Sequence, residues 1–247
     1  MKTSNNVIII TGAAGGIGSG IAKGLDKSGN VLCLCDNNER ILKIKSAFKK
    51  ATLFVRKLDC GVEEDVISFV KEVVKKYKKI DTLVNCAGVV PYFNVEETEY
   101  DIFTNTFKSN VGGYFLFSRA VVPEMKKLGK GNIVNIASIS ARLGIKGQTA
   151  YASTKGAIAS LTRVLATELG EYNIRVNSIS PGCILVDRNR EKMLKKYEDT
   201  DFLKSRIPLC RLGLPKDIAG IVEFLISPKA SYIHGADIVV DGGQSIV

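Results

Sequence analysis

The sequence predicts an α/β fold in which about seven parallel strands form a doubly wound sheet with helices on both faces. Three observations predict it: short β-branched apolar runs recur along the 247 residues, amphipathic stretches of helical length separate them, and a glycine-rich turn follows the first run. Uniformly apolar strands are typical of a sheet covered on both faces, and alternation with helices is typical of parallel pairing. No linker, repeat or low-complexity segment interrupts this pattern, so we expect a single domain over residues 1–247.

Each expected element follows from its pattern of apolar residues. Strands are expected at 7–11, 31–35, 52–58, 80–85, 131–137, 174–179 and 236–240. Helices, where apolar residues recur at helical spacing, are expected at 16–28, 38–49, 63–77, 100–128, 151–171, 190–205 and 215–226. The most polar segment of the chain, 187–206, includes one of these helices and is interpreted as a solvated surface element.

The first strand runs directly into the glycine-rich sequence TGAAGGIG at 11–18. Glycine lets a backbone turn tightly and approach a phosphate closely, and the amino end of the following helix favours negative charge. Asp36 ends the second apolar run, 18 residues after Gly18, close to the spacing of about 20 expected for a ribose-binding carboxylate. The sequence therefore predicts a Rossmann-like sheet that binds a dinucleotide.

Tyr151 and Lys155 lie four residues apart in YASTK. On a helix this spacing places both side chains on one face, with Cβ atoms about 5–6 Å apart. A free phenol has a pKa of about 10, and an ammonium held beside it favours the phenolate and lowers that pKa. The pair therefore suits proton exchange with an alcohol or carbonyl oxygen.

Several motifs in a fixed order resemble the short-chain dehydrogenase/reductase family. They are TGAAGGIG at 11–18, NCAG at 85–88, IASIS at 136–140, YASTK at 151–155, SPG at 180–182 and the tail HGADIVVDGG at 234–243. The resemblance spans nearly the whole chain. It implies that residues 1–247 form one dinucleotide-binding and catalytic domain, which moves a hydride between a nicotinamide cofactor and a secondary alcohol or its ketone.

The resemblance implies four catalytic side chains. Tyr151 would exchange a proton with the substrate oxygen, and Lys155 would lower the tyrosine pKa and hydrogen-bond the nicotinamide ribose. Ser138 would hold the substrate oxygen, and Asn110 in KSNVGG would hold a water in the proton relay. All four positions are filled, which favours a working enzyme, and this chemistry requires no metal ion.

The resemblance also implies a cofactor site. Asp36 would accept the two adenosine ribose hydroxyls and repel a 2′-phosphate, and the positions where NADP-preferring members often carry a basic residue hold Gly15 and Asn37. NAD is therefore expected rather than NADP. Asn85 also has a structural role in the family, where it braces the central strands. The predicted cofactor residues are Gly12, Gly16, Ile17, Gly18, Asp36, Asp59, Cys60, Asn85, Ala87, Gly88, Tyr151, Lys155, Pro181, Gly182 and Ile184.

One position departs from the family pattern, and the substrate residues are less well defined. Val186 replaces the threonine that often contacts the nicotinamide carboxamide. Candidate substrate residues are Ser138, Gln148, Arg142 and Tyr92. The resemblance also implies that the segment 187–206, after the SPG turn, covers the substrate, which is compatible with a solvated helix. Arg142 either meets an anionic group of the substrate or is a surface charge.

Composition limits the other classes of partner. The chain carries 35 Lys and Arg against 25 Asp and Glu, a formal charge of +10, but the lysines lie on the polar faces of expected helices and no nucleic-acid-binding motif is present. Six cysteines without a C-x-x-C pair, and a lone His234, favour free thiols in a reducing compartment. No apolar stretch reaches membrane-spanning length. We expect a cytoplasmic protein without nucleic-acid or membrane partners.

Three functions remain open at this level. The first is an NAD-dependent oxidoreductase acting on a sugar, polyol or hydroxy acid. The second is a 3-oxoacyl-thioester (acyl-carrier-protein) reductase, which IPLCRLGLPKDIAG resembles and the charge of +10 suits, although Asp36 disfavours NADPH. The third is an NAD-sensing binding protein, against which the intact catalytic set speaks. The resemblance further implies a homotetramer, or else a dimer, assembled through the helices near 100–128 and 151–171 and the C-terminal tail.

Overall fold

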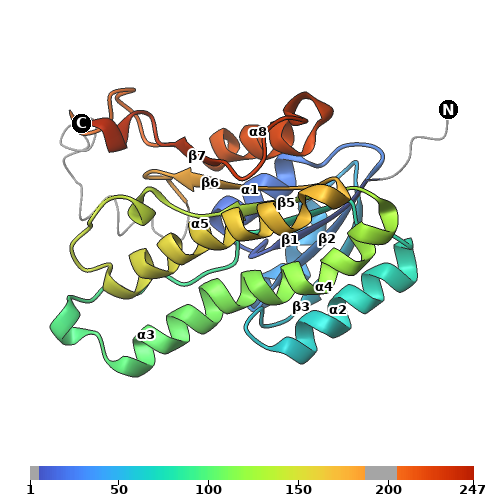
Figure 1. Cartoon of the computed structure of the whole chain (residues 1–247), viewed down its shortest axis with the longest axis horizontal. Helices are drawn as coiled ribbons and strands as arrows, with labels where there is room; N and C mark the ends of the chain where they lie inside the picture. Colours follow the sequence, from blue (N-terminus) through green and yellow to red (C-terminus); the bar gives the residue numbers. More distant parts are fainter. Residues whose placement is uncertain (1–5, 187–204) are drawn as a thin grey trace.

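One parallel sheet of seven strands organises the computed structural model, which describes residues 6–186 and 205–247. The strand order is β3-β2-β1-β4-β5-β6-β7 (Figure 1), and every neighbouring pair is parallel. The strands are β1 (Asn6–Thr11), β2 (Asn30–Asp36), β3 (Thr52–Lys57), β4 (Thr82–Asn85), β5 (Gly131–Ile136), β6 (Ile174–Pro181) and β7 (Asp237–Val240). All seven predicted strands are confirmed, and the sheet has the order of a Rossmann fold.

Helices cover both faces of this sheet (Figure 1). They are α1 (Gly16–Gly24), α2 (Glu63–Tyr77), α3 (Tyr100–Phe107), α4 (Gly113–Leu128), α5 (Thr149–Leu169) and α8 (Pro215–Ile226). Strand β1 shows why two layers are needed, because its side chains alternate between faces. Val7 and Ile9 pack in one core cluster with α2, α4 and α5, whereas Ile8 and Ile10 pack in another with α1 and α8.

Two predicted helices differ in detail. The helix expected at 38–49 is a 3₁₀ helix, η1 (Glu39–Ala47), in which Ile41 alone is buried. One inward side chain cannot anchor a longer amphipathic helix. The helix expected at 100–128 contains a π-helical turn, η3 (Lys108–Gly112), between α3 and α4. The helix expected at 190–205 lies almost wholly outside the described residues.

No helix in residues 6–186 and 205–247 is both long enough and apolar enough to cross a membrane.

A half-buried arginine joins β6 to the end of α8. The guanidinium of Arg175 donates to the carbonyls of Leu225 and Ala230 at 2.7 Å each, and to those of Ser227 and Ile233 at 3.3 and 3.5 Å. The last carbonyls of a helix have no partner inside the helix. Arg175 therefore satisfies the carboxyl end of α8 and the 3₁₀ turn η6 (Pro228–Ala230) that leads toward β7.

We predict that Arg175→Met destabilises the protein by about 3 kcal/mol, because buried carbonyls lose their charged donor. For a chain of this length, that change corresponds to a fall in Tm of about 6–12 °C. The matched control is Arg163→Met on α5, where the arginine is exposed, and it should leave Tm nearly unchanged. Thermal unfolding of both variants by circular dichroism measures the difference; equal Tm values would contradict the assignment.

Candidate active site

The glycine turn after β1 touches the turn after β4. Gly12 has a left-handed φ of +68°, and a Cβ there would lie 2.7 Å from Ala87 Cα. A Cβ on Gly18 would lie 2.2 Å from the Gly12 carbonyl oxygen. Thr11 Oγ1 accepts from the backbone N–H groups of Cys86 and Ala87 at 3.0 and 3.1 Å. The two turns therefore form one rigid unit at the point where the strand order reverses, which is where such sheets bind ligands.

The carboxylate expected to bind ribose lies beside that unit. Asp36 ends β2 and is half-buried. Its Oδ2 accepts from Ala14 N–H at 3.0 Å, and its Oδ1 accepts from Asn38 N–H at 2.8 Å. A tight glycine turn, a helix amino end and a fixed carboxylate form a cradle whose shape and donors fit a dinucleotide. The neighbouring Asn37 is exposed and carries no charge.

Of the two residues predicted to flank the adenine, one is exposed and the other is buried. Asp59 is exposed, and its Oδ1 accepts from Gly61 N–H at 2.8 Å. Cys60 is buried in the core, with its Cβ against Gly113. The Cys60 side chain therefore packs inward, and its backbone is the part that can face a ligand.

The Asn85 side chain connects the end of β4 to β5 and α4 by hydrogen bonds. It has no exposed surface, and its Nδ2 donates to Asn135 Oδ1 on β5 at 2.9 Å and to Ser118 Oγ on α4 at 3.4 Å. Asn135 Nδ2 in turn donates to Thr162 Oγ1 on α5 at 2.9 Å. The Asn85 amide is therefore turned into the protein, as its structural role in the family suggests, and its binding of cofactor stays a prediction.

Tyr151 and Lys155 lie on one face of α5, as predicted. Lys155 Nζ is 5.5 Å from the centre of the Tyr151 ring, and it donates to the Ile136 carbonyl at 2.7 Å. Tyr114 Oη donates to the same carbonyl at 3.0 Å. Ser138, just after β5, shares a hydrogen bond with Tyr151. The end of β5 thus positions both the lysine and the serine beside the tyrosine.

Asn110 ties the turn after β4 to α5. It lies in the π-helical turn η3, a feature often found at functional sites. Its Oδ1 accepts from Val89 N–H at 2.8 Å, and its Nδ2 donates to the Val89 carbonyl and to Thr154 Oγ1, each at 3.0 Å. Thr154 Oγ1 donates to the Tyr151 carbonyl at 2.7 Å. Thr154 and Thr11 are positioning residues; they lie within the motifs YASTK and TGAAGGIG, which assigned them no role.

Burial sets the acid–base character of the tyrosine and lysine. It raises the pKa of Tyr151 to about 12, against the opposite effect of the hydrogen bond with Ser138. It lowers the pKa of Lys155 to about 8. The pKa of Tyr151 therefore lies above that of a free phenol, because desolvation of the phenolate outweighs the hydrogen bond with Ser138; that Lys155 lowers this pKa stays a prediction. At neutral pH the tyrosine holds its proton and most of the lysine is charged.

The candidate substrate residues separate into two groups. Gln148 Oε1 accepts from Ser140 Oγ at 2.7 Å, close to Ser138, and Tyr92 is half-exposed with its ring against Gly147. Arg142 instead donates through Nη2 and Nε to Asp237 Oδ2 at 2.9 and 3.2 Å. The structure thus supports the interpretation of Arg142 as a surface charge that is paired within the protein.

The turn after β6 is held by the C-terminal tail. Gly182 N–H donates to the Val240 carbonyl at 3.1 Å, and Cys183 N–H donates to Gln244 Oε1 at 2.9 Å. Gln244 was not predicted, because no motif includes it. Pro181 and Ile184 are buried on either side of this turn. Val186 packs against the glycine turn, with Cγ1 3.1 Å from the Cβ position of Gly16.

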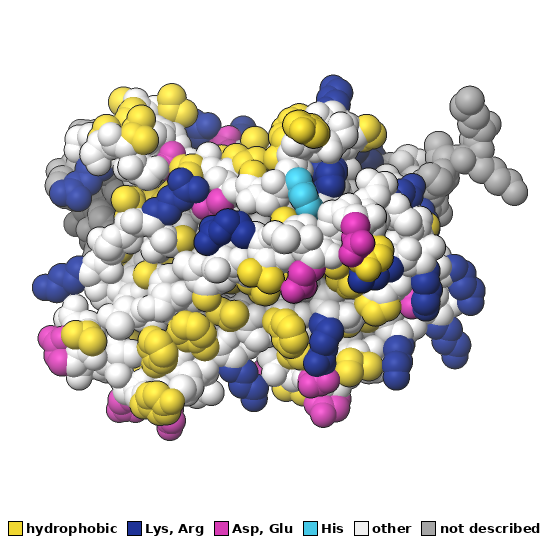
Figure 2. All heavy atoms as spheres, viewed as in Figure 1, with side chains coloured by type: hydrophobic (Ala, Val, Ile, Leu, Met, Phe, Trp, Pro, Cys, Tyr) yellow, Lys and Arg dark blue, Asp and Glu magenta, His cyan; other side chains and the backbone are white. Residues whose placement is uncertain are grey.

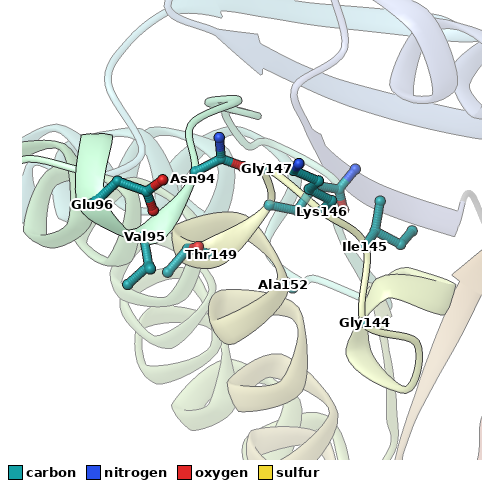
Figure 3. Close-up of a pocket in the computed structure, with 10 residues that line it drawn as sticks. Asn94, Val95, Glu96, Gly144, Ile145, Lys146, Gly147, Thr149 and Ala152 are labelled. Atoms are coloured by element: carbon teal, nitrogen blue, oxygen red, sulfur yellow. The ribbon is translucent and has the colours of Figure 1, made fainter.

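A cavity of about 440 Å³ lies at the start of α5; Gln148 helps to line it, but Ser138 and Tyr151 do not. It is lined by Asn94, Val95, Glu96, Gly144, Ile145, Lys146, Gly147, Gln148, Thr149 and Ala152. Figure 3 shows 94–96 on one side, 144–146 on the other, and the first turn of α5 between them. Among the described residues, no group of three or more His, Cys, Asp or Glu side chains is placed to hold a metal ion.

The sheet order, the glycine cradle and the cluster at the carboxyl edge define a Rossmann-type oxidoreductase. Residues 12–245 match the family model described as enoyl-(acyl carrier protein) reductase. The chain belongs to the short-chain dehydrogenase/reductase family, whose members are NAD(P)-dependent enzymes that act on CH–OH groups of small molecules.

Three relatives illustrate the breadth of this family. The chain is 33% identical over 243 residues to an NAD-dependent glycerol dehydrogenase from Listeria innocua, covering 98% of this chain and 95% of that protein. It is 35% identical over 254 residues to a 3-oxoacyl-[acyl-carrier-protein] reductase from Thermotoga maritima, with full coverage of both. The crystal structure of levodione reductase superposes with a TM-score of 0.92 at 30% identity, covering 99% of each chain.

We predict that Gly18→Ala weakens NADH binding by about 10- to 100-fold, because its methyl group would collide with a backbone carbonyl in the cradle. Gly15→Ala is the matched control, since a Cβ at Gly15 meets nothing within 4 Å; alanine is only a poorer N-cap for α1, and we expect a loss of affinity within about threefold. Fluorescence titration with NADH measures both affinities. Equal affinities in the two variants would show that the turn does not form the dinucleotide site.

A second prediction concerns pH. Because the pKa of Lys155 is about 8, kcat/KM for ketone reduction should fall as the pH rises through about 8, by about tenfold per unit, as the ammonium beside Tyr151 is lost. Lys155→Arg keeps its charge across this range and should remove the fall. Initial rates from about pH 6 to about pH 10 measure the profile. An identical decline in the arginine variant would assign it to another group.

Proposed function

We propose that the protein is an NAD-dependent dehydrogenase that interconverts a secondary alcohol (a sugar, polyol or hydroxy acid) and its ketone, with residues 1–247 acting as one dinucleotide-binding and catalytic domain. The observation that carries the proposal is the meeting of Ser138, Tyr151 and Lys155 at the end of β5, on the edge of the sheet that holds the glycine turn. Acid–base groups and a dinucleotide cradle are thereby placed on the same edge.

Each side chain has a role that follows from its contacts. A bound nicotinamide would supply or accept the hydride. Tyr151 gives its proton to the ketone oxygen in reduction and takes it from the alcohol in oxidation, and Ser138 holds that oxygen through its hydroxyl. Lys155, fixed by the Ile136 carbonyl, provides positive charge beside the phenol when the tyrosine is deprotonated. Asn110, clamped to Val89, would hold the water that carries the proton onward.

We propose NAD rather than NADP as the cofactor. The Asp36 carboxylate accepts two backbone N–H groups and remains half-buried at the predicted ribose position. A 2′-phosphate there would face a negative charge with no cation from the neutral Asn37. The relative from Listeria innocua is described as NAD-dependent, which supports the same choice.

We further propose a cytoplasmic homotetramer, with a dimer as the alternative. The face formed by α3, α4 and α5 exposes apolar side chains, among them Tyr100, Phe115 and Val164, and Figure 2 shows apolar patches over these helices. Such a face favours burial against a second copy. All six cysteines are free thiols, which suits a reducing compartment. Light scattering measures the assembly, and a monomer would contradict it.

A second candidate is reduction of a 3-oxoacyl thioester. The Thermotoga maritima relative carries that name at 35% identity, and the formal charge of +10 would attract an acidic carrier protein. Asp36 speaks against the NADPH that the resemblance associates with this branch. A third candidate is an NAD sensor without turnover. It requires that the cluster of Ser138, Tyr151 and Lys155 has no catalytic role.

The test is a spectrophotometric panel of sugars, polyols, hydroxy acids and 3-oxoacyl thioesters with NAD(H) and NADP(H) separately. We expect NAD-linked oxidation of one alcohol class, and Tyr151→Phe should lower kcat by at least about 1,000-fold while NADH binding is kept. Turnover of the thioesters alone would favour the second candidate. NAD binding with no turnover anywhere would favour the sensor.

A further inference from the structure

Ser140 is a buried hydroxyl that serves the catalytic serine. It follows Ser138 by two residues, and both side chains are more than nine-tenths buried. Ser140 N–H donates to Ser138 Oγ at 3.1 Å, and the two hydroxyl oxygens are also 3.1 Å apart. Ser140 Oγ then contacts Gln148 Oε1 at 2.7 Å. A chain of hydrogen bonds therefore runs from Gln148 through Ser140 to Ser138.

The direction of this chain follows from its chemistry. An amide oxygen only accepts, so Ser140 must give its single hydrogen to Gln148. The Ser138–Ser140 contact then requires the hydrogen of Ser138. That same hydrogen is the one with which Ser138 would hold a substrate oxygen. In the resting arrangement, Gln148 and Ser140 thus compete with the substrate for the catalytic serine.

Gln148 also faces the cavity of about 440 Å³, which it helps to line. It lies three residues before Tyr151, one helical turn away, so a substrate with its reacting oxygen at Tyr151 can reach Gln148 with a neighbouring group. Within the described residues, no hydrogen-bond partner is recorded for the Gln148 amide nitrogen. Toward the described part of the chain, the amide therefore has two unused N–H donors beside the oxygen that it offers to Ser140.

The cavity beside Gln148 suits a neutral, hydroxylated part of a substrate. Its polar lining consists of the neutral side chains of Asn94, Gln148 and Thr149 together with one acid, Glu96, and one base, Lys146. The two charges cancel, and Arg142 is paired with Asp237. No surplus cation in the described lining selects a carboxylate. Amide and hydroxyl groups suit hydroxyls instead, which both donate and accept.

We propose that Gln148 and Ser140 form a substrate-responsive latch that selects vicinal diols, the polyol class. This inference rests on the proposed dehydrogenase function. A hydroxyl adjacent to the reacting carbon donates to Gln148 Oε1, Ser140 turns its hydrogen to Ser138, and Ser138 is left with its own hydrogen for the reacting oxygen. Each hydroxyl still gives one hydrogen, so the exchange leaves no donor unused. A simple alcohol lacks the group that releases the latch. Ser140 is thus a positioning residue, and Gln148 determines specificity.

The test compares butane-2,3-diol with butan-2-ol, which differ by one hydroxyl, in NAD-linked oxidation. The readout is the ratio of their kcat/KM values. We expect the unchanged protein to favour the diol by about tenfold, and Ser140→Ala or Gln148→Ala to reduce that preference by about fivefold or more, the worth of one hydrogen bond. General damage to the site would lower both alcohols alike and leave the ratio unchanged.

Ser153→Ala is the matched control, because it removes an exposed α5 hydroxyl that donates to the Thr149 carbonyl, and the ratio should not change. NADH titration and thermal unfolding verify that each variant folds; if Ser140→Ala does not, Gln148→Ala carries the test. Absence of a diol preference in the unchanged protein, or an unaltered ratio in folded variants, would overturn the latch alone. No turnover of any alcohol in the panel would overturn the proposed function and the latch with it.

Discussion

The structure depends on one close backbone contact, that of the glycine turn after β1 with the turn after β4. Gly12 can approach Ala87 only because it has no Cβ, and Thr11 fixes the same two segments by accepting from two backbone N–H groups. This contact lies where the sheet order reverses between β1 and β4. Helices on both sides diverge from that point, which leaves the carboxyl edge open for a ligand.

The acid–base cluster depends on a second constraint, which is burial. Lys155 and Tyr114 both donate to the Ile136 carbonyl, so the lysine is held by β5 and is not free to follow the phenol. Burial then moves the two pKa values apart, raising that of Tyr151 to about 12 and lowering that of Lys155 to about 8. In the resting site, Tyr151 is therefore protonated. A neutral phenol beside the charged lysine avoids the cost of desolvating a second charge, the phenolate.

The predictable features are those that local pattern controls. Uniformly apolar strands such as β1 can be recognised from the sequence alone. The glycines of the first motif likewise indicate a turn in which a Cβ atom would collide with the backbone. The YASTK motif correctly placed Tyr151 beside Lys155, since helical spacing alone determines it. Properties that depend on residues far apart in the sequence could not be predicted from it. Arg142 meets Asp237, 95 residues away, and the pKa of Tyr151 depends on how much of the protein surrounds it. Ser140 was overlooked because its importance lies in its contact with Gln148.

The π-helical turn η3 shows how the fold and the site are coupled. A π turn holds more residues than an α-helical turn, and here it contains Asn110, whose amide both accepts from and donates to the backbone of Val89. The same amide donates to Thr154, which bonds to the Tyr151 carbonyl. The turn after β4 and the start of α5 are thereby linked through one buried side chain. Thr11 fixes the other end of that turn. A displacement of the glycine cradle would therefore also displace Tyr151. The fold thus fixes the position of the cofactor site relative to the proton donor.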